Sequence, residues 1–320
     1  MIIVRFQGGL GNQMSQFAFY RKLQSIYGED FVRADLAYYQ CHRAHNGFEL
    51  NRVFPETTRG FVSLNRKEIT KVTKLIPEKY LVETVHAFPN NFLEYLRVHV
   101  NGQLQKYYKK VSYNRMLEQD VSGDAYEQTE FYHLDVQKDW YLDGYWYQYD
   151  YSDVWKQLKQ DFQFPKEQVK CHRALTEQMQ MEASVSVHVR GGDYLKTSYA
   201  VLGKKYYKQA VEEIRSRVSN PRFYIFSDSM EYAVKLLDFL KTEEVILVDQ
   251  NRGKDAWRDL YLMSCCRHHI MANSTFSMWA TLLNSEKDTV TVAPRYETKT
   301  RKYAIQPEWI QLGREWLEFE

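Results

Sequence analysis

Strand-like and helix-like segments alternate with short connections from about residue 184 onward. This order predicts an α/β domain, in which a parallel sheet carries helices on both faces. The expected strands are residues 184–189, 223–226, 245–248, 270–272 and 290–293. The expected helices are residues 206–218, 230–240, 255–267 and 277–283. Ligands of such sheets bind beyond the carboxyl ends of the strands.

Polar residues gather at four of those carboxyl ends. They are His188, Arg190 and Asp193 at the end of the first strand, Ser227 and Asp228 at the end of the second, Asp249 at the end of the third, and Asn273, Ser274, Thr275 and Ser277 at the end of the fourth. One polar end would mean little, because loops are polar in any case. Four in succession indicate a binding site.

The first of these ends carries the clearest chemistry. Arg190 presents a planar, permanently charged fork that suits phosphate oxygens, and Gly191 and Gly192 let the backbone approach a ligand closely. A nucleotide-type ligand is therefore expected. Residues 274–277 precede an apolar helix and have two interpretations, plain N-caps or a phosphate site at the helix N-terminus.

The beginning of the chain repeats the pattern once, with a strand at 2–6, a glycine turn at 7–11 and a helix at 12–27. The turn fits neither the dinucleotide fingerprint G-x-G-x-x-G nor a Walker A loop. Its glycines indicate either a close approach to a ligand or a structural turn. One helix face is expected to hold Phe19, Tyr20, Leu23, Ile26 and Tyr27, and the other Arg21, Lys22 and Ser25.

Five motifs occur in order along the chain. They are residues 8–14 (Gly-Gly-Leu-Gly-Asn-Gln-Met), 188–194 (His-Val-Arg-Gly-Gly-Asp-Tyr), 223–228 (Phe-Tyr-Ile-Phe-Ser-Asp), 259–264 (Asp-Leu-Tyr-Leu-Met-Ser) and 270–279 (Ile-Met-Ala-Asn-Ser-Thr-Phe-Ser-Met-Trp). Together with residues 143–148 (Asp-Gly-Tyr-Trp-Tyr-Gln), they resemble the bacterial α-1,2-fucosyltransferases of glycosyltransferase family 11. The correspondence is weakest between about residues 30 and 130.

The resemblance implies a GT-B-like enzyme, in which two Rossmann-like domains face a cleft. Its donor would be GDP-fucose, and fucose would pass with inversion to the 2-hydroxyl of a terminal β-galactose in a surface-polysaccharide or oligosaccharide acceptor. We expect an acceptor-side domain over residues 1–175 and a GDP-fucose-binding domain over residues 176–320. The tail, residues 307–320, is expected to form a helix that packs back on the first domain.

The resemblance also implies roles for single residues. Arg190 would bind the diphosphate, His188 would place the nucleotide, and Asp193 would order the turn or assist at the sugar. Donor-site positions would further include Gly9, Asn12, Ser227, Asp228, Asp259 against guanine, Asn273, Ser274, Thr275 and Ser277. One departure is visible, because Gly191 stands where the family has a second arginine.

We expect the negative charge on the departing diphosphate to be stabilised by Arg190 and a helix N-terminus rather than by a metal ion. No cofactor is expected. Metal-dependent glycosyltransferases usually supply an Asp-x-Asp, which this chain lacks. The sets Cys41, His42, His45 and Cys265, Cys266, His268, His269 lack closed zinc-ligand spacing, so core or surface positions are expected. The acceptor's base is not readable from the sequence. Asp193 and Asp228 are candidates, and either could instead hold a loop.

The composition fits a chain of two domains without nucleic-acid partners. Its 320 residues carry 43 basic and 41 acidic side chains, a net charge of +2. With no long apolar run, no signal peptide and four cysteines, a cytoplasmic protein without a membrane span is expected. Basic residues at 66–79 and 106–110 suit either peripheral contact with anionic lipid near a lipid-linked acceptor or a solvated face.

The aromatic run at Tyr145, Trp146 and Tyr147 has two interpretations, acceptor contact or core. Two other classes of protein stay open. One is another fucosyltransferase type, α-1,6 or O-fucosyl, although the Gly-Gly-Leu-Gly-Asn-Gln turn favours the α-1,2 family. The other is a non-catalytic nucleotide-sugar-binding protein, which would release no GDP when given GDP-fucose and a galactoside.

Overall fold

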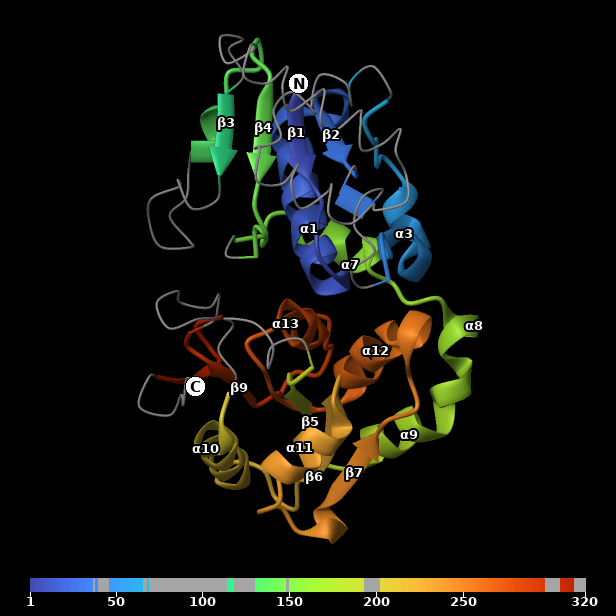
Figure 1. The fold of residues 1–320 in the computed structure, drawn as a ribbon, viewed down its shortest axis with the longest axis vertical. Helices are drawn as coiled ribbons and strands as arrows, with labels where there is room; N and C mark the ends of the chain where they lie inside the picture. The colour runs from blue at the N-terminus through green and yellow to red at the C-terminus, as the bar shows by residue number, and fades with distance from the viewer. Residues whose placement is uncertain are drawn as a thin grey trace, which may run out of the picture. The chain divides into compact units, whose positions relative to one another are not determined.

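The computed structural model consists of two compact units, Met1–Gln163 and Phe164–Glu320, each built on its own parallel sheet (Figure 1). It describes residues 1–36, 38–39, 46–65, 68, 114–117, 130–147, 150–192, 202–296 and 306–313, with the backbone alone at 114–117 and 130. The α/β class predicted from the sequence is confirmed in both units.

The second unit holds a six-stranded sheet in the order β10-β9-β8-β5-β6-β7, and every neighbouring pair is parallel. Its strands are β5 (Ser184–Val189), β6 (Arg222–Ser227), β7 (Val245–Val248), β8 (His268–Ile270), β9 (Thr291–Pro294) and β10 (Ile310–Leu312). Five of the six were expected, with bounds that differ by no more than two residues. All carboxyl ends of these strands therefore lie at one edge of this sheet.

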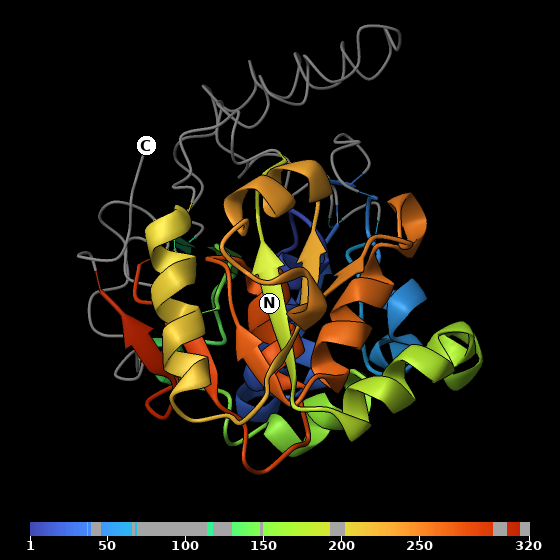
Figure 2. The ribbon, with the colours of Figure 1, turned by 90° about the horizontal axis from the view of Figure 1, so that it is seen from below.

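Helices cover both faces of this sheet. They are α8 (Lys166–Val169), α9 (Arg173–Met181), α10 (Lys204–Arg215), α11 (Met230–Leu236), α12 (Trp257–Cys265) and α13 (Thr275–Leu282), with short 3-10 turns η5 (Lys170–His172), η7 (Thr242–Glu244) and η8 (Gly253–Asp255). Val185, Val187 and Val189 pack with α10 and α11 in one core, while His188 points to the other face, toward α13. In Figure 2, β5 lies between the yellow α10 and the green α9.

The boundary between the units falls between Gln163 and Phe164, twelve residues before the expected position at 175. Helices α8 and α9 belong to the second unit because they pack on it. Phe164 stacks on Trp257 with ring centroids 6.1 Å apart and meets Tyr261 edge-on at 5.2 Å. Helix α9 also contacts α12, which belongs to the second unit.

The predicted helix of the tail is wrong for residues 310–312, which form the edge strand β10 beside β9. Ile310 and Leu312 pack into the core while Gln311 between them is exposed, an alternation typical of a strand. The helix was predicted because Trp309 and Leu312 are three residues apart, a spacing that also fits one face of a helix. Residues 314–320 of the predicted helix lie outside the described part.

The first unit has a four-stranded parallel sheet in the order β2-β1-β4-β3. Its strands are β1 (Ile2–Arg5), β2 (Val32–Asp35), β3 (Asn114–Leu117) and β4 (Trp140–Asp143). Its helices are α1 (Leu10–Tyr27), α3 (Leu50–Val53) and α7 (Trp155–Asp161), with 3-10 turns η1 (Glu29–Phe31), η2 (Pro55–Thr58) and η4 (Glu130–His133). Strand β1 is central, so the glycine turn that follows it lies between the ends of β2 and β4.

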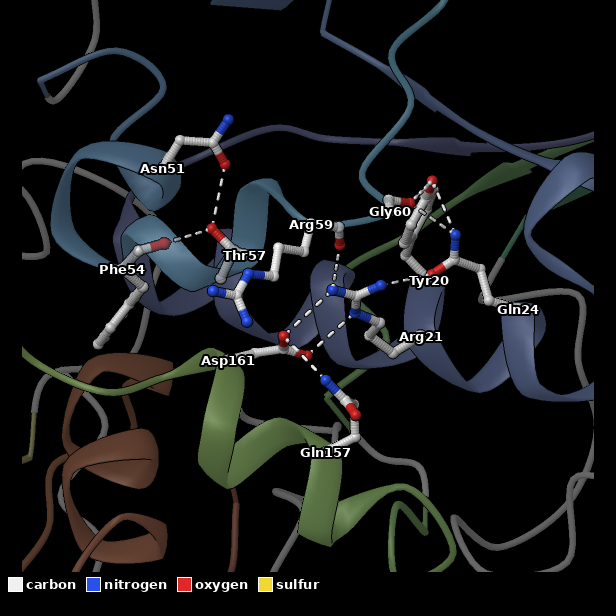
Figure 3. Close-up of polar contacts among 10 residues, drawn as sticks. All are labelled: Tyr20, Arg21, Gln24, Asn51, Phe54, Thr57, Arg59, Gly60, Gln157 and Asp161. Atoms are coloured by element: carbon white, nitrogen blue, oxygen red, sulfur yellow. Dashed lines mark hydrogen bonds and ion pairs between the residues drawn. The ribbon is translucent and has the colours of Figure 1, made fainter.

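The face of α1 that carries Arg21, Lys22 and Ser25 is only partly solvated, because Arg21 and Lys22 are buried while Ser25 is exposed. Arg21 donates from Nε and Nη2 to the two carboxylate oxygens of Asp161 on α7 at 3.0 and 3.1 Å, and from Nη1 to Gln24 (Figure 3). Lys22 donates to Asp153 at 3.0 Å. A buried charge needs such a partner, and these partners lie more than a hundred residues away, beyond the reach of a periodicity argument.

Candidate active site

One carboxylate organises the turn after β5. Asp228, which follows the neighbouring strand β6, accepts a bond from Nη1 of Arg190 on Oδ2 at 2.7 Å. Its Oδ1 accepts the backbone N–H groups of Gly191 and Gly192 at 2.9 and 3.0 Å. Arg190 and Asp228, both predicted site residues, are thus brought together, and the guanidinium is fixed before any ligand arrives.

The two glycines of this turn leave no room for a side chain. A Cβ on Gly192 would lie 2.9 Å from Oδ2 of Asp228, and one on Gly191 would lie 2.7 Å from Cδ1 of Tyr232. The ring of Tyr232 therefore stands where the family's second arginine would begin. The packing of Tyr232 against the turn therefore explains why a glycine, and not a second arginine, is found at position 191.

His188 lies on the buried face of the sheet beside this turn, only 5% exposed. Its ring centroid is 5.9 Å from that of Phe276 in α13, and its carbonyl oxygen accepts the hydroxyl of Tyr207 at 2.9 Å. Nδ1 is buried and has no hydrogen-bond partner among the residues that the structure describes. Burial first, and then the charge of Arg190, lower the pKa of His188 to about 4. The imidazole is therefore neutral at pH 7.

The N-terminus of α13 is capped by its own side chains. Ser274 accepts the N–H of Phe276 at 3.3 Å, which confirms the N-cap interpretation for this residue. The Ser277 hydroxyl donates to the carbonyl oxygens of Ala272 and Ser274 at 3.3 and 3.2 Å. Asn273 is buried at the end of the preceding connection, and Thr275 is partly exposed. A phosphate contact at this N-terminus stays a prediction.

Ser227 has a local structural role, because its hydroxyl oxygen accepts the N–H of Ser229 at 3.0 Å. That bond holds the turn from which Asp228 projects. The predicted contact of Ser227 with a donor stays a prediction. Asp193, the second predicted catalytic residue, lies outside the described residues.

Asp259 lies in the first turn of α12, near the loop that follows β7. Nδ2 of Asn251 donates to its Oδ1 at 2.7 Å. Burial raises the pKa of Asp259 to about 7, although the bond from Asn251 and the charge of Arg252 oppose that rise. A carboxyl that titrates near neutrality is typical of a functional position. Asn251 was missed, although it follows a strand end as the predicted residues do.

The glycine turn of the first unit is held by neutral groups. Gly8 has φ +78°, and a Cβ there would lie 2.5 Å from Nδ2 of Asn12. Its carbonyl oxygen accepts Nε2 of Gln13 at 3.1 Å and the hydroxyl of Tyr39 at 3.0 Å. Gly9 is the N-cap residue of α1 and provides no side-chain cap. The predicted site residues Gly9 and Asn12 both belong to this turn.

Charged residues under this turn neutralise one another. Nη1 of Arg5 lies 3.1 Å from Oδ2 of Asp143, and Nε2 of Gln7 donates to the same carboxylate at 3.4 Å. The hydroxyl of Tyr141 donates to Asp35 at 2.8 Å. Sequence reasoning placed Asp143 in a motif but missed both pairings, since each pair joins strands more than a hundred residues apart.

The aromatic run after β4 is mostly core. Trp146 and Tyr147 are buried, and Trp146 stacks on Phe19 with centroids 4.4 Å apart. The backbone of Trp146 is left-handed, with φ 56°, so the chain turns sharply here. The core interpretation is confirmed for these two residues. Tyr145 is partly exposed.

No cluster of three or more metal-ligating side chains occurs among the described residues. The buried His269 forms hydrogen bonds with Ser186 and Asn284 at 2.8 Å each, and Cys266 is also buried, so both have core positions. Residues 41–45 lie outside the described part. Within the described ranges, no helix combines the length and the apolar character that crossing a membrane requires.

Each unit is an α/β unit built on a parallel sheet, and in the second unit Asp228 holds an arginine turn at the carboxyl edge of that sheet. The sequence model of glycosyl transferase family 11 matches residues 1–313. The chain therefore belongs to glycosyl transferase family 11, as its motifs predicted.

Named relatives agree with that family. An α-1,2-colitosyltransferase of Escherichia coli is 26% identical over 301 residues, covering 92% of this chain and 91% of the relative. Galactoside α-(1,2)-fucosyltransferase 2 of Pongo pygmaeus is 31% identical over 137 residues, 39% of each chain. Among solved structures, the fucosyltransferase NodZ from Bradyrhizobium is similar with a TM-score of 0.49 and 14% identity, covering 90% of this chain and 95% of that one.

Proposed function

We propose that this family 11 glycosyltransferase transfers fucose from GDP-fucose to the 2-hydroxyl of a terminal β-galactose, with inversion at the anomeric carbon. The observation that carries the donor part is the turn at Arg190, whose guanidinium and two following amides are all oriented by Asp228. The galactoside acceptor and the α-1,2 linkage are supported by the names of relatives within the family.

The reaction needs stabilisation of negative charge on the departing nucleotide. The acceptor oxygen bonds to the anomeric carbon while the bond from that carbon to the β-phosphate oxygen breaks, and the electron pair leaves with GDP. Arg190 and the N-terminus of α13, which follow the neighbouring strands β5 and β8, would supply fixed positive potential where that charge grows. We propose that this suffices without a metal ion or another cofactor.

A base must take the proton of the acceptor hydroxyl. Asp228 is poorly suited, because its two oxygens already hold the guanidinium of Arg190 and the backbone N–H groups of Gly191 and Gly192. We assign it to positioning Arg190. Of the two candidates, Asp193 remains the proposed catalytic carboxylate.

The remaining donor residues follow from their positions. Neutral His188 would place the nucleotide, Asp259 would accept the guanine N–H groups, and Asn273 to Ser277 would meet the phosphates. The first unit would receive the acceptor, with Gly9 and Asn12 at its glycine turn. Free thiols at Cys171, Cys265 and Cys266 support the proposed cytoplasmic location. Apart from Glu68, the basic stretches proposed for peripheral membrane contact lie outside the described residues.

A second candidate donor comes from the relative that covers most of this chain, a colitosyltransferase. Colitose is fucose without its 3-hydroxyl group, so the two donors differ by one polar contact. A site that hydrogen-bonds the 3-hydroxyl would reject the colitosyl donor strongly, because a buried polar group would be left unpaired.

Turnover with both donors tests the proposal. The protein is incubated with GDP-fucose or GDP-colitose and lactose, GDP release is measured, and the product linkage is determined by NMR. We expect GDP release with GDP-fucose and fucose on the 2-hydroxyl of galactose. Preference for GDP-colitose would favour the second candidate. Fucose on the 6-hydroxyl would indicate another transferase type, and no GDP release from either donor would indicate a binding protein.

A further inference from the structure

Tyrosines flank the glycine turn of the first unit on both sides. Tyr38 and Tyr39 follow the carboxyl end of β2, and Tyr145 follows the carboxyl end of β4. Strand β1 lies between these two strands and leads into the turn at Gly8. Because all three strands are parallel, the tyrosines and the turn share one edge of the sheet.

Electrostatic contact supports this closeness. Burial raises the pKa of Tyr39 well above its usual value, and the neighbouring Tyr38 and Tyr145 raise it further. Groups from the ends of both flanking strands therefore reach Tyr39, which itself donates to the carbonyl oxygen of Gly8 at 3.0 Å. The three tyrosines surround one turn although more than a hundred residues separate Tyr39 from Tyr145.

The rings at this edge differ from the core aromatics nearby. Tyr38 and Tyr145 are partly exposed, whereas Trp146 is fully buried. Tyr38 meets Tyr39 edge-on, with centroids 5.2 Å apart and an interplanar angle of 87°, and the guanidinium carbon of Arg5 lies 5.9 Å from its ring centre. Packing therefore fixes the ring of Tyr38 while leaving part of it open to a ligand.

Polar groups for a neutral ligand lie beside these rings. The Asn12 amide reaches over Gly8, where any Cβ would stand only 2.5 Å from its nitrogen. Asn12 is partly exposed, and Arg5 and Asp143, at the ends of β1 and β4, form an ion pair. A flat ring and an amide suit a pyranose, which has an apolar C–H face and a rim of hydroxyls.

We propose that Tyr38 and Tyr145, with Asn12 between them, hold the terminal galactopyranoside of the acceptor. Tyr39 acts as a positioning residue, because its hydroxyl and ring fix the turn and Tyr38. The proposal rests on the transferase function above for the identity of its ligand. It replaces Trp146 and Tyr147 as acceptor contacts, since both are used in the core.

Binding of methyl β-D-galactopyranoside, followed by saturation-transfer NMR at several sugar concentrations, tests this site without requiring turnover. Tyr38→Ala and Tyr145→Ala are each expected to weaken binding about tenfold, the usual order for losing one stacked ring. Phe31→Ala is the matched control, because Phe31 is a 43% exposed ring at the opposite, amino end of β2. It should bind like the wild type, and GDP affinity should change less than about twofold in all three variants.

If an alanine variant fails to fold, Tyr38→Leu and Tyr145→Leu decide, because leucine keeps apolar volume and removes the flat ring. No galactoside binding to the wild type, or unchanged binding in the tyrosine variants, would overturn the proposal. Tyrosine-dependent binding in a protein that forms no product from GDP-fucose would support this site and refute the proposed transfer alone.

Discussion

The two glycine turns have the same place in their sheets and opposite chemistry. The turn at Gly8 is held by neutral donors, the amide of Gln13 and the hydroxyl of Tyr39. The turn at Arg190 is held by a carboxylate that binds a cation and two amides. In our proposal, sheet topology sets where a ligand binds, and the charge of the turn selects a neutral sugar at the first turn and an anion at the second.

The ion pairs beside the two turns, Arg5–Asp143 and Arg190–Asp228, also differ in their solvent exposure. The side chains of Arg5 and Asp143 are 7% and 2% exposed, whereas those of Arg190 and Asp228 are 23% and 26% exposed. The first pair is part of the buried frame, and the second keeps access to solvent and hence to a ligand. Changes at the two pairs should therefore have different consequences, for stability at the first and for activity at the second.

The largest expected effect is on stability, at the first pair. Asp143→Ala leaves the buried Arg5 without its partner and should lower the free energy of unfolding by about 3 to 5 kcal/mol. Asp228→Ala should lower it by only about 1 to 2 kcal/mol, since its partners are partly solvated. Urea unfolding measures both. Equal losses of unfolding free energy in the two variants would contradict the distinction between a buried structural pair, Arg5–Asp143, and a ligand-accessible pair, Arg190–Asp228.

Activity should depend on the second pair. Arg190→Ala is expected to lower kcat by about 10²- to 10³-fold, the usual cost of removing one oriented donor to developing charge. Arg190→Lys should restore little, because an ammonium cannot reproduce the fork. Arg173→Ala, which removes an exposed arginine of α9 in the same unit, is the control in steady-state assays. An Arg190→Ala protein with near-normal kcat would remove Arg190 from the mechanism.

Nucleotide binding should depend on pH through Asp259. Its pKa of about 7 means that ionisation of the free protein is incomplete at neutrality, and guanine recognition needs the carboxylate. GDP affinity should therefore rise as pH increases from about 6 to about 8, with a limiting slope of about tenfold per unit below the pKa. UDP should bind far more weakly throughout. Calorimetry that gives a flat profile, or equal affinities for the two nucleotides, would contradict this assignment.

The raised pKa of Asp259 also makes the stability of the fold depend on pH. The pKa of Asp259 is higher in the folded chain than its ordinary value of 3.8, so its contribution to folding is complete below that value and is lost as pH rises through about 7. Asp259→Asn should abolish this part of the pH dependence of unfolding. A profile identical to that of the wild type would contradict the buried-carboxyl explanation.

The smallest expected effect is that of chelation. With charge stabilisation assigned to Arg190 and the N-terminus of α13, EDTA should leave turnover unchanged, and added Mg²⁺ or Mn²⁺ should not raise it. Loss of activity with EDTA and recovery with either cation would show that the electrostatic account of the second turn is incomplete.

The alternation of strands and helices predicted the second sheet, because each of its strands is an apolar run with a helix beside it in sequence. It failed at β10, because Trp309 and Leu312 also fit the spacing of a helix. In the first unit, β2, β3 and β4 were not predicted, because polar or charged side chains interrupt their short apolar runs.

Those polar side chains also explain what was missed at the sites. Asp143 is stable inside the protein only because Arg5 lies opposite it, 138 residues away. Arg21 and Asp161 depend on each other across 140 residues. Local patterns located the residues that follow strand ends, such as Arg190 and Asp228. They could not locate pairs that the sheet order alone brings together.

Calorimetric titration of Arg190→Ala with GDP and then with methyl β-D-galactopyranoside tests the division between the two turns most directly. The account predicts that GDP affinity falls by about 30-fold or more, the usual loss when a partner of a charged contact is removed, while galactoside affinity stays within about twofold of the wild type. Unchanged GDP affinity, or an equal loss for both ligands, would contradict it.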